Sequence, residues 1–174
     1  QWQLGTPNYG QTNSAFSAPN SWDINLNTTY GPEAATYLYS PWFDLSASVD
    51  PILTFRQNRN TDLYNAGFYL EWVTPGSTTW TPLGIYNDPS GTNWYNQTIS
   101  STFPSAFWHG SSNGWTQSTY PLTGVVPVDT LVQFRFVFLS STFTTPEDGV
   151  SIDNFNIEMP LNNDAELKSV VNPG

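Results

Sequence analysis

The chain has 174 residues, a net charge of −10 and no cysteine, and only 10% of its residues are charged, against roughly 25% in an ordinary domain. Because contacts to phosphate groups need Lys and Arg, this charge makes nucleic acid and anionic membranes unfavourable partners. The lack of cysteine excludes disulfides, thiolate zinc sites and cysteine nucleophiles, and no apolar run approaches the ~20 residues that insert across a membrane.

The N-terminal part of the chain predicts short strands between turns. In residues 1–36 the prolines exclude a long helix, which leaves short edge segments joined by turns rich in Asn, Gly and Pro. Residues 37–45, YLYSPWFDL, have the pattern of a strand that Pro41 interrupts. Because proline cannot donate a backbone hydrogen bond, we expect an edge strand or a bend at this point.

The next part predicts antiparallel strands at hairpin spacing. Residues 52–58 and 66–74 alternate large apolar with polar side chains, which is typical of half-buried strands. The turn at Pro75–Gly76 leads into STTWTPLGIY, residues 77–86, where we expect another strand. The composition agrees, because 16% aromatic residues together with 14 Pro and 12 Gly favour strands and turns over helices.

Residues 87–114 form a long segment with almost no periodicity and many aromatic residues. A loop of this length in a compact domain is usually functional or packed by its own side chains. Trp94 and Trp108 therefore have two interpretations. They either close the open end of a sandwich and bury their rings, or lie exposed as a patch that stacks on sugars or contacts another protein.

The C-terminal third returns to strand patterns. Residues 115–122 alternate, and residues 131–138, LVQFRFVF, place phenylalanines on one face and more polar side chains on the other. We count about nine or ten strands and no helix over the whole chain. Two packed antiparallel sheets bury such half-apolar strands, so the predicted fold is an all-β sandwich with jelly-roll connectivity.

The last predicted strand, VSIDNFNIEM, changes its facing midway. Val150 and Ile152 share one parity, whereas Phe155 and Ile157 share the other. A slip of one residue is what a β-bulge at Asp153–Asn154 would produce. Bulges often re-aim a side chain, so this position is a candidate part of a site.

Domain boundaries follow from the turn at Pro160. We expect residues 1–160 to form the sandwich and residues 161–174 to be a linker or the first strand of a following domain. The chain begins with Gln1 and not Met, which indicates a piece of a longer protein.

A series of short phrases occurs in an order that resembles a known family. The phrases are WQLGTP, APNSW, YLYSPWFDLS, LTFRQN, FWHGSSNGW, VQFRFVF and DGVSIDNFNI, and they cover residues 1–158. Together they resemble the MAM-like jelly-roll modules of secreted bacterial proteins, which accompany immune-inhibitor-A-type peptidases and large surface adhesins. The resemblance implies an accessory module without catalytic residues. The tail DAELKSVVNPG resembles the start of the Ig-like repeats that often follow such modules.

The arginines allow a structural or a ligand-binding role. Arg56 and Arg135 lie in the polar rows of two strands, and Tyr69 and Glu71 form the polar row of a third. If these strands adjoin, Arg–Glu pairs cross the sheet and stabilise it. The alternative is a glycan platform, in which Tyr69, Arg56 and Arg135 stack on a sugar and hydrogen-bond it.

Signs of catalysis are sparse. The single histidine, His109, lies in a loop, and such a histidine is more often packed than catalytic. No GxSxG elbow is present. A carboxylate-based glycoside hydrolase would depend on Glu71 and scattered aspartates alone. We therefore predict that the chain is not an enzyme.

A structural Ca²⁺ ion is predicted near the bulge, because Ca²⁺ takes roughly six to eight oxygen ligands from carboxylates, amides and carbonyls. The candidate ligands are Asp153, Asp148, Glu147, Asn25 and Asn27. In related modules, as the resemblance implies, such an ion clamps the N-terminal and last strands. The chain departs from the family at Gln1 and at Asn65–Gly67, where the family often carries acidic residues. The alternative is that Asp153 only accepts backbone N–H bonds at the bulge.

These features favour a non-catalytic binding or adhesion module of a larger bacterial surface protein, with a polysaccharide or cell-surface glycan as its ligand. The low charge and the abundance of Asn, Thr and aromatic residues favour a secreted or cell-surface location. The alternative is a structural spacer that packs against neighbouring domains of the same chain. A glycoside hydrolase is the third hypothesis.

Overall fold

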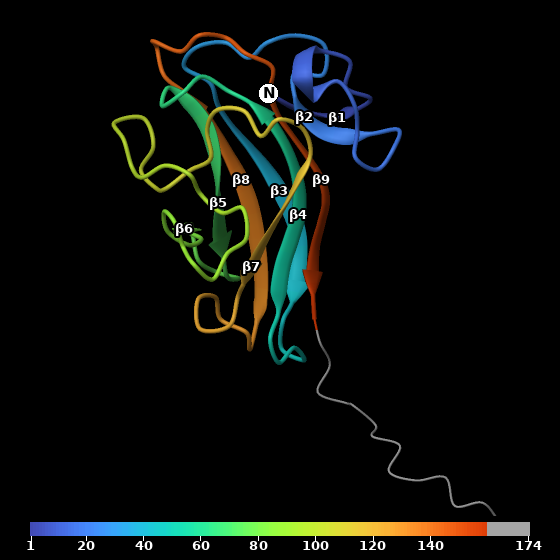
Figure 1. Cartoon of the computed structure of the whole chain (residues 1–174). Helices are drawn as coiled ribbons and strands as arrows, with labels where there is room; N and C mark the ends of the chain where they lie inside the picture. Colours follow the sequence, from blue (N-terminus) through green and yellow to red (C-terminus); the bar gives the residue numbers. More distant parts are fainter. Residues whose placement is uncertain (160–174) are drawn as a thin grey trace, which may run out of the picture.

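Nine strands and one 3-10 turn make up the computed structural model, which describes residues 1–159 (Figure 1). The elements are β1 (Trp2–Gly5), η1 (Gly10–Thr12), β2 (Ser21–Ile24), β3 (Ala35–Asp44), β4 (Ile52–Asn60), β5 (Ala66–Val73), β6 (Thr81–Pro82), β7 (Thr116–Pro121), β8 (Leu131–Ser140) and β9 (Gly149–Glu158). The predicted linker or following strand at 161–174 lies outside the described residues.

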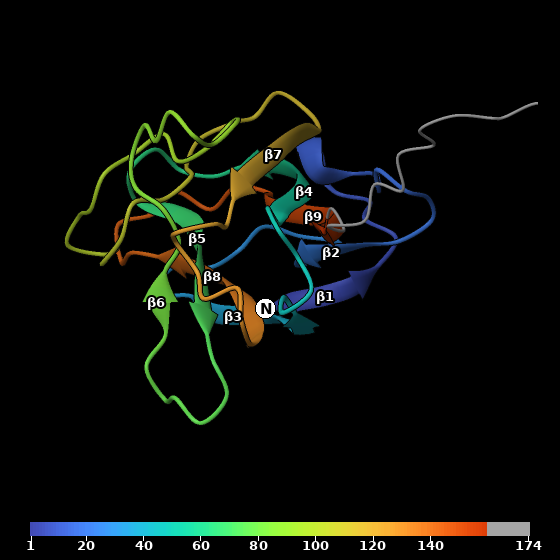
Figure 2. The ribbon, with the colours of Figure 1, turned by 90° about the horizontal axis from the view of Figure 1, so that it is seen from below.

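The strands form two antiparallel layers, which are seen nearly end-on in Figure 2. The larger sheet has the order β1-β2-β9-β4-β7, and the smaller sheet has the order β3-β8-β5-β6. The all-β, two-sheet antiparallel sandwich predicted from the alternation is thereby confirmed, whereas the jelly-roll connectivity stays a prediction. Strand β3, which contains Pro41, is an edge strand of its sheet, as the proline predicts.

The phenylalanines of β8 form the centre of the core. Phe134, Phe136 and Phe138 are two residues apart, so they share one face, and all three are buried. The ring of Phe136 meets Phe55 of β4 edge-on, with 5.1 Å between ring centroids. Each such ring removes roughly 150–250 Å² from water. This contact joins β8 and β4, an inner strand of each sheet, and the outer faces of the two sheets lie on opposite sides of the molecule.

The predicted bulge in β9 is present. Arg56 of β4 pairs with Asp153, and Thr54, two residues earlier, pairs with Asn156, three residues later. Between these two pairs β9 has one residue more than β4. This stretch of β9 contains Asn154, whose φ of 50° is in the left-handed region. Apolar side chains before and after the bulge therefore reach the same core: Val150, Ile152, Phe155 and Ile157.

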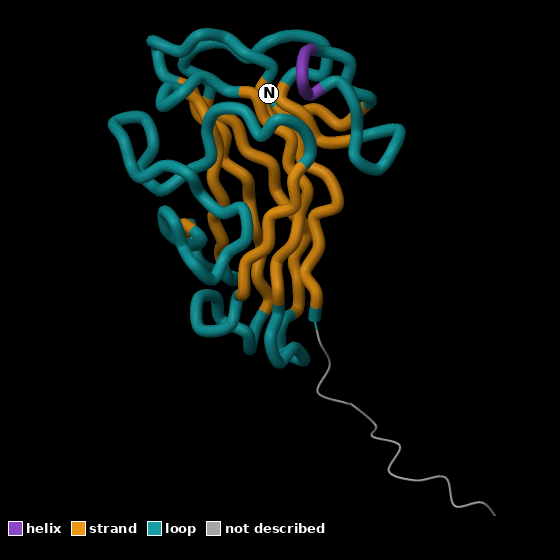
Figure 3. The backbone as a smooth tube through the Cα atoms, viewed as in Figure 1, coloured by secondary structure: helices purple, strands orange, loops and turns teal. Residues whose placement is uncertain are grey.

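The predicted strand at 77–86 is wrong, because only Thr81–Pro82 pairs with β5. Pro82 lacks a donor, and Gly84 has a φ of 78°, which ends the extended conformation. The segment 87–114 contains no named strand, in agreement with its lack of periodicity. It runs over one side of the sandwich, where Figure 3 shows long loops, and makes isolated bridges to β5 and β7.

Candidate functional site

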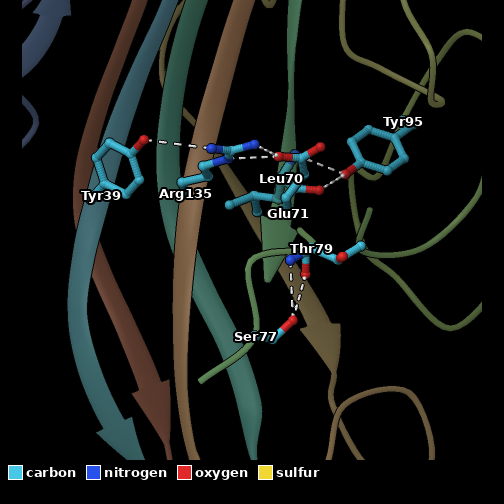
Figure 4. A network of polar contacts seen from close by, with 7 residues as sticks. All are labelled: Tyr39, Leu70, Glu71, Ser77, Thr79, Tyr95 and Arg135. Atoms are coloured by element: carbon cyan, nitrogen blue, oxygen red, sulfur yellow. Dashed lines mark hydrogen bonds and ion pairs between the residues drawn. The ribbon is translucent and has the colours of Figure 1, made fainter. Parts of the chain in front are cut away.

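Arg135 on β8 and Glu71 on β5 lie directly opposite each other on the outer face of the smaller sheet. Nη2 and Nε of Arg135 each approach the same Glu71 oxygen to 2.6 Å (Figure 4). Only 17% of the Arg135 side chain and 9% of the Glu71 side chain are exposed. The structural interpretation of a cross-strand Arg–Glu pair is therefore correct for these two residues.

Aromatic rings surround the Arg135 guanidinium. Its central carbon lies 4.2 Å from the ring centre of Trp80 and 4.6 Å from that of Tyr37. Nη1 also donates to the Tyr39 hydroxyl at 3.5 Å (Figure 4), and the Tyr39 ring meets Trp80 edge-on. Cation–π contacts contribute about 0.5–1 kcal/mol each at exposed sites. The ion pair thus holds the surrounding rings in defined positions.

Strand β3 exposes a row of aromatic side chains along this face. Tyr37, Tyr39 and Trp42 are 43%, 51% and 44% exposed. Tyr37 and Tyr39 are neighbours in the row, with 6.4 Å between ring centroids. Together with Trp80 they form what we call the aromatic face. Exposed large apolar side chains gathered in one patch commonly mark an interaction site.

Trp42 joins the row because β3 has an irregularity at Pro41. In an undisturbed strand, residues 39 and 42 would point to opposite faces. Here Tyr39 pairs with Arg135 and Trp42 pairs with Gln133, so one extra β3 residue is inserted between them. Gln133 and Arg135 share one face of β8, and Trp42 therefore points to the same side as Tyr39.

Hydrogen bonds hold this irregularity in place. The Gln133 side-chain amide donates to the carbonyl of Ser40 at 2.8 Å, and the backbone N–H of Phe134 donates to the Ser40 hydroxyl at 3.0 Å. The Ser40 hydroxyl in turn donates to the carbonyl of Pro41 at 2.7 Å. The backbone groups that the insertion removes from the ladder thus regain partners.

Two tryptophans predicted as ligand-binding residues lie in the core, so that assignment is corrected. Trp108 is 1% exposed and stacks on Phe68 of β5, with 4.8 Å between ring centroids. Trp94 is 7% exposed and stacks on Tyr120 of β7 at 4.3 Å. Both rings close the side of the sandwich between its two sheets, which was the alternative interpretation.

Tyr69 and Arg56 do not share one exposed surface with Arg135. Tyr69 is buried beside Glu71, and burial together with the Glu71 carboxylate raises the pKa of its phenol. Arg56 belongs to the larger sheet, so its side chain lies on the opposite side of the molecule from Arg135. The predicted platform of Tyr69, Arg56 and Arg135 is therefore wrong. Of the three, only Arg135 supports the aromatic face.

The sequence carried a signal for the aromatic face that the pattern analysis did not use. Large aromatic residues occupy alternate positions 37 and 39 of a strand whose proline marks it as an edge. An edge strand leaves its outer-face side chains uncovered on one side. The facing of Trp42 can be predicted only when the inserted residue near Pro41 is known. The place of Trp80 beside this row can be predicted only when the fold is known.

The five predicted calcium ligands do not form one group. Asp153 accepts from the backbone N–H of Ser17 and of Asn154, both at 2.7 Å, which is the alternative predicted for it. Asn25 accepts from the N-terminal ammonium at 3.2 Å, and Asn27 is exposed. Within residues 1–159, no three His, Cys, Asp or Glu side chains are grouped so that they could hold a metal ion.

Two of the predicted ligands do meet at the other end of β9. The side-chain amide of Asn60 lies 3.3 Å from a carboxylate oxygen of Glu147 and 3.3 Å from one of Asp148. The backbone N–H of Gln11 donates to the same Asp148 oxygen. These contacts place the turn at Glu147–Asp148 against the N-terminal segment.

Asp23 is a further acidic residue at this end, and it was missed. It is 1% exposed, accepts from the hydroxyl of its register partner Ser151, and leaves its Oδ1 without a hydrogen-bond partner. Burial raises the pKa of Asp23 to about 7, and the negative charge of Asp148 adds to the rise. A buried carboxylate with an unpartnered oxygen beside a second carboxylate fits an oxygen-binding cation. The only sequence signal for Asp23 as a candidate ligand is that an acidic residue lies within the short strand SWDI.

His109 has a structural role in the long loop. Its ring is buried, and Nδ1 accepts from the backbone N–H of Tyr64 at 3.1 Å. Burial and the nearby Arg59 charge lower the pKa of the imidazole. The neutral ring therefore serves as an acceptor that holds the loop after β4. That the chain is not an enzyme stays a prediction.

Comparison with protein-family models finds no match for this chain, and comparison with curated protein sequences finds none either. The MAM-like resemblance therefore stays a prediction. In the part of the chain that the structure describes, no helix has the length and apolar character needed to cross a membrane.

Proposed function

We propose that this chain is a non-catalytic carbohydrate-binding module that acts in cell adhesion, and that its aromatic face contacts the glycan. The observation that carries the proposal is the exposed row of Tyr37, Tyr39 and Trp42 along β3. The C–H faces of sugar rings are apolar and stack on aromatic rings, whereas their hydroxyl groups need polar partners. The tyrosine hydroxyls and the indole N–H of this row supply such partners at the same surface.

The rigidity of the aromatic face favours binding. Arg135 contacts Tyr37, Tyr39 and Trp80 and is itself held by Glu71. Side chains that are already ordered lose little conformational entropy when a ligand arrives. Because the row follows one strand, the geometry favours an extended polysaccharide that lies along β3 over a compact small molecule.

A secreted or cell-surface location follows as part of the same proposal. The resemblance to MAM-like modules and the low charge with abundant Asn, Thr and aromatic residues support a surface module of a larger bacterial protein. Neighbouring domains of that protein would hold the module at the surface and orient the aromatic face toward a polysaccharide or a cell-surface glycan.

A glycan array tests the proposal with wild-type chain, Tyr39→Ala and Trp42→Ala. We expect specific binding that each substitution weakens by at least about tenfold, a loss of roughly 1.4 kcal/mol, without a change in melting temperature. Phe143→Ala is the matched control, because Phe143 is 86% exposed on the loop after β8. A wild-type chain that binds no glycan would instead favour the structural spacer, with the aromatic face packed against a neighbouring domain.

We also propose that a structural Ca²⁺ ion binds between Asp23 of β2 and Asp148, which directly precedes β9. The support is the buried, unpartnered Oδ1 of Asp23 together with the neighbouring carboxylate of Asp148. Because no third carboxylate within residues 1–159 is grouped with these two, amide and carbonyl oxygens would complete the set. Asp153 is not part of this set, because backbone N–H groups engage both of its oxygens. When bound, the ion would tie the β2 segment to the turn before β9.

A further inference from the structure

The outer face of the larger sheet carries a polar pocket that is separate from the aromatic face. The pocket has a volume of about 230 Å³. Its polar lining consists of Thr54, Arg56, Gln117, Asn154 and Asn156. These residues come from the adjacent strands β7, β4 and β9, whereas the aromatic face belongs to the smaller sheet. The two surfaces therefore lie on opposite sides of the sandwich.

Arg56 offers free hydrogen-bond donors to this pocket. Its guanidinium carbon lies 4.3 Å from the ring centre of Phe16, so one flat side of the group is covered. Among residues 1–159, Arg135 and Glu71 form the only ion pair, and no hydrogen bond is made by the Arg56 side chain. The N–H groups at the edge of the guanidinium plane are thus available to a ligand.

The carboxylate opposite Arg56 in the register is engaged by other groups. Asp153 is the register partner of Arg56, yet its two oxygens accept from the backbone N–H groups of Ser17 and Asn154. No ion pair forms between Asp153 and Arg56 in the described part of the chain. The bulge causes this arrangement, because it turns the Asn154 N–H toward Asp153 and places Asn154 in the pocket lining.

Two amide side chains complete the polar lining. The side chains of Gln117 and Asn156 form no hydrogen bonds with other groups of residues 1–159, although both line the pocket. Each amide can donate and accept, which matches the hydroxyl groups of a sugar. Phe16, which covers one side of the Arg56 guanidinium, meets Trp115 edge-on with 6.0 Å between ring centroids, so Arg56 packs against an aromatic pair.

We propose that this pocket binds one sugar unit that carries a carboxylate, such as a uronic acid. The planar fork of Arg56 donates to both carboxylate oxygens, while Gln117 and Asn156 hydrogen-bond the hydroxyl groups. The pocket is smaller than the ~300–1,000 Å³ of sites for drug-sized ligands, so it suits a single monosaccharide. The proposal deepens the proposed glycan-binding function by adding a second site of different chemistry.

The net charge of −10 does not oppose this assignment at close range. At physiological salt the screening length is about 8 Å, so distant carboxylates contribute little at the pocket. The guanidinium of Arg56, which forms no ion pair within residues 1–159, is the positive charge that lines the pocket. A neutral sugar would gain only the amide contacts and would bind more weakly.

Nuclear magnetic resonance titrations with glucuronate and with glucose test the proposal on the whole chain. We expect glucuronate to shift the side-chain N–H signals of Arg56, Gln117 and Asn156 in a saturable way, and glucose to bind at least about tenfold more weakly. Arg56→Gln should lower glucuronate affinity by a similar factor. Arg56→Lys keeps the charge but loses the planar pair of donors, so its glucuronate affinity should lie between those of wild-type chain and Arg56→Gln.

Variants of the other face keep this test independent of the first proposal. Tyr39→Ala and Trp42→Ala should leave the glucuronate titration unchanged, even where they abolish binding on a glycan array. Equal affinity for glucose and glucuronate would overturn the carboxylate assignment. Wild-type affinity in Arg56→Gln, or no saturable shift with either sugar, would overturn the site itself.

Discussion

The guanidinium of Arg135 and the carboxylate of Glu71 meet directly across β8 and β5 at 2.6 Å, and this contact lies beneath the exposed rings of the aromatic face. Arg56 occupies an equally polar strand position but belongs to the other sheet, where no carboxylate pairs with it within residues 1–159. Two arginines with the same strand pattern therefore have different roles. One supports a surface from below, and the other keeps its donors free.

Arg135→Leu should lower the free energy of unfolding by about 1–3 kcal/mol, because Glu71 would stay buried without its charge-assisted hydrogen bonds. Urea denaturation measures the change. Arg56→Leu is the matched control and should shift stability by at most about 1 kcal/mol, since its side chain loses a cation–π contact with Phe16 but has no carboxylate partner to abandon. Similar small changes in both variants would show that the ion pair contributes nothing to stability.

Stability in the absence of metal should depend on the protonation of Asp23. Its pKa in the folded chain is raised from 3.8 to about 7, so the folded state keeps a proton that the unfolded chain has released. Stability is therefore highest below pH ~4 for this group and falls by a few kcal/mol as the pH rises to about 7. Denaturation in a chelator across this range measures the slope. Asp23→Asn should flatten it, and an unchanged slope in that variant would contradict the assignment.

Calcium should reverse this loss at neutral pH. A bound cation stabilises the ionised form of Asp23, so millimolar Ca²⁺ should raise the melting temperature of wild-type chain by several degrees above its value in chelator. Asp23→Asn and Asp148→Asn should remove that difference. Asp153→Ala, which the sequence pattern placed in the site, should keep it. Identical curves with and without Ca²⁺ in wild-type chain would rule out the ion.

The bulge should tolerate few residues at position 154. Asn154 has a φ of 50°, which β-branched side chains adopt only at a cost, so Asn154→Val should destabilise the chain by about 1–2 kcal/mol. Asn156→Val, two residues further along the same strand, should change stability little, because β-branched residues suit extended backbone. Thermal unfolding compares the two, and equal effects would mean that the left-handed conformation is not required.

Trp108 and Trp42 should separate folding from binding. Trp108→Ala should destabilise the chain by about 3–5 kcal/mol, since the ring is 1% exposed and packs between Phe55 and Phe68. Trp42→Ala removes a ring that is 44% exposed and should leave the unfolding free energy within about 0.5 kcal/mol. A folded, stable Trp108→Ala variant would place that ring outside the core.

Local alternation in the sequence indicated most of the long strands and the bulge in β9. The parity of Phe134, Phe136 and Phe138 indicated one buried face, and the slip between Ile152 and Phe155 predicted the bulge in β9. These features depend only on residues a few positions apart, because successive side chains of a strand alternate between its faces. Pro41 likewise indicated an edge strand through its missing donor.

Only the tertiary structure decided which strands are neighbours, and the candidate sites follow from that choice. Strand β8 lies between β3 and β5, so Arg135 meets Glu71 and the rings of the aromatic face, while β4 carries Arg56 to the other sheet. Burial of Trp108 and of Asp23 is likewise set by segments far away in the sequence that cover them. Periodicity reports the facing of a side chain within its own strand, but long-range packing decides what lies opposite it.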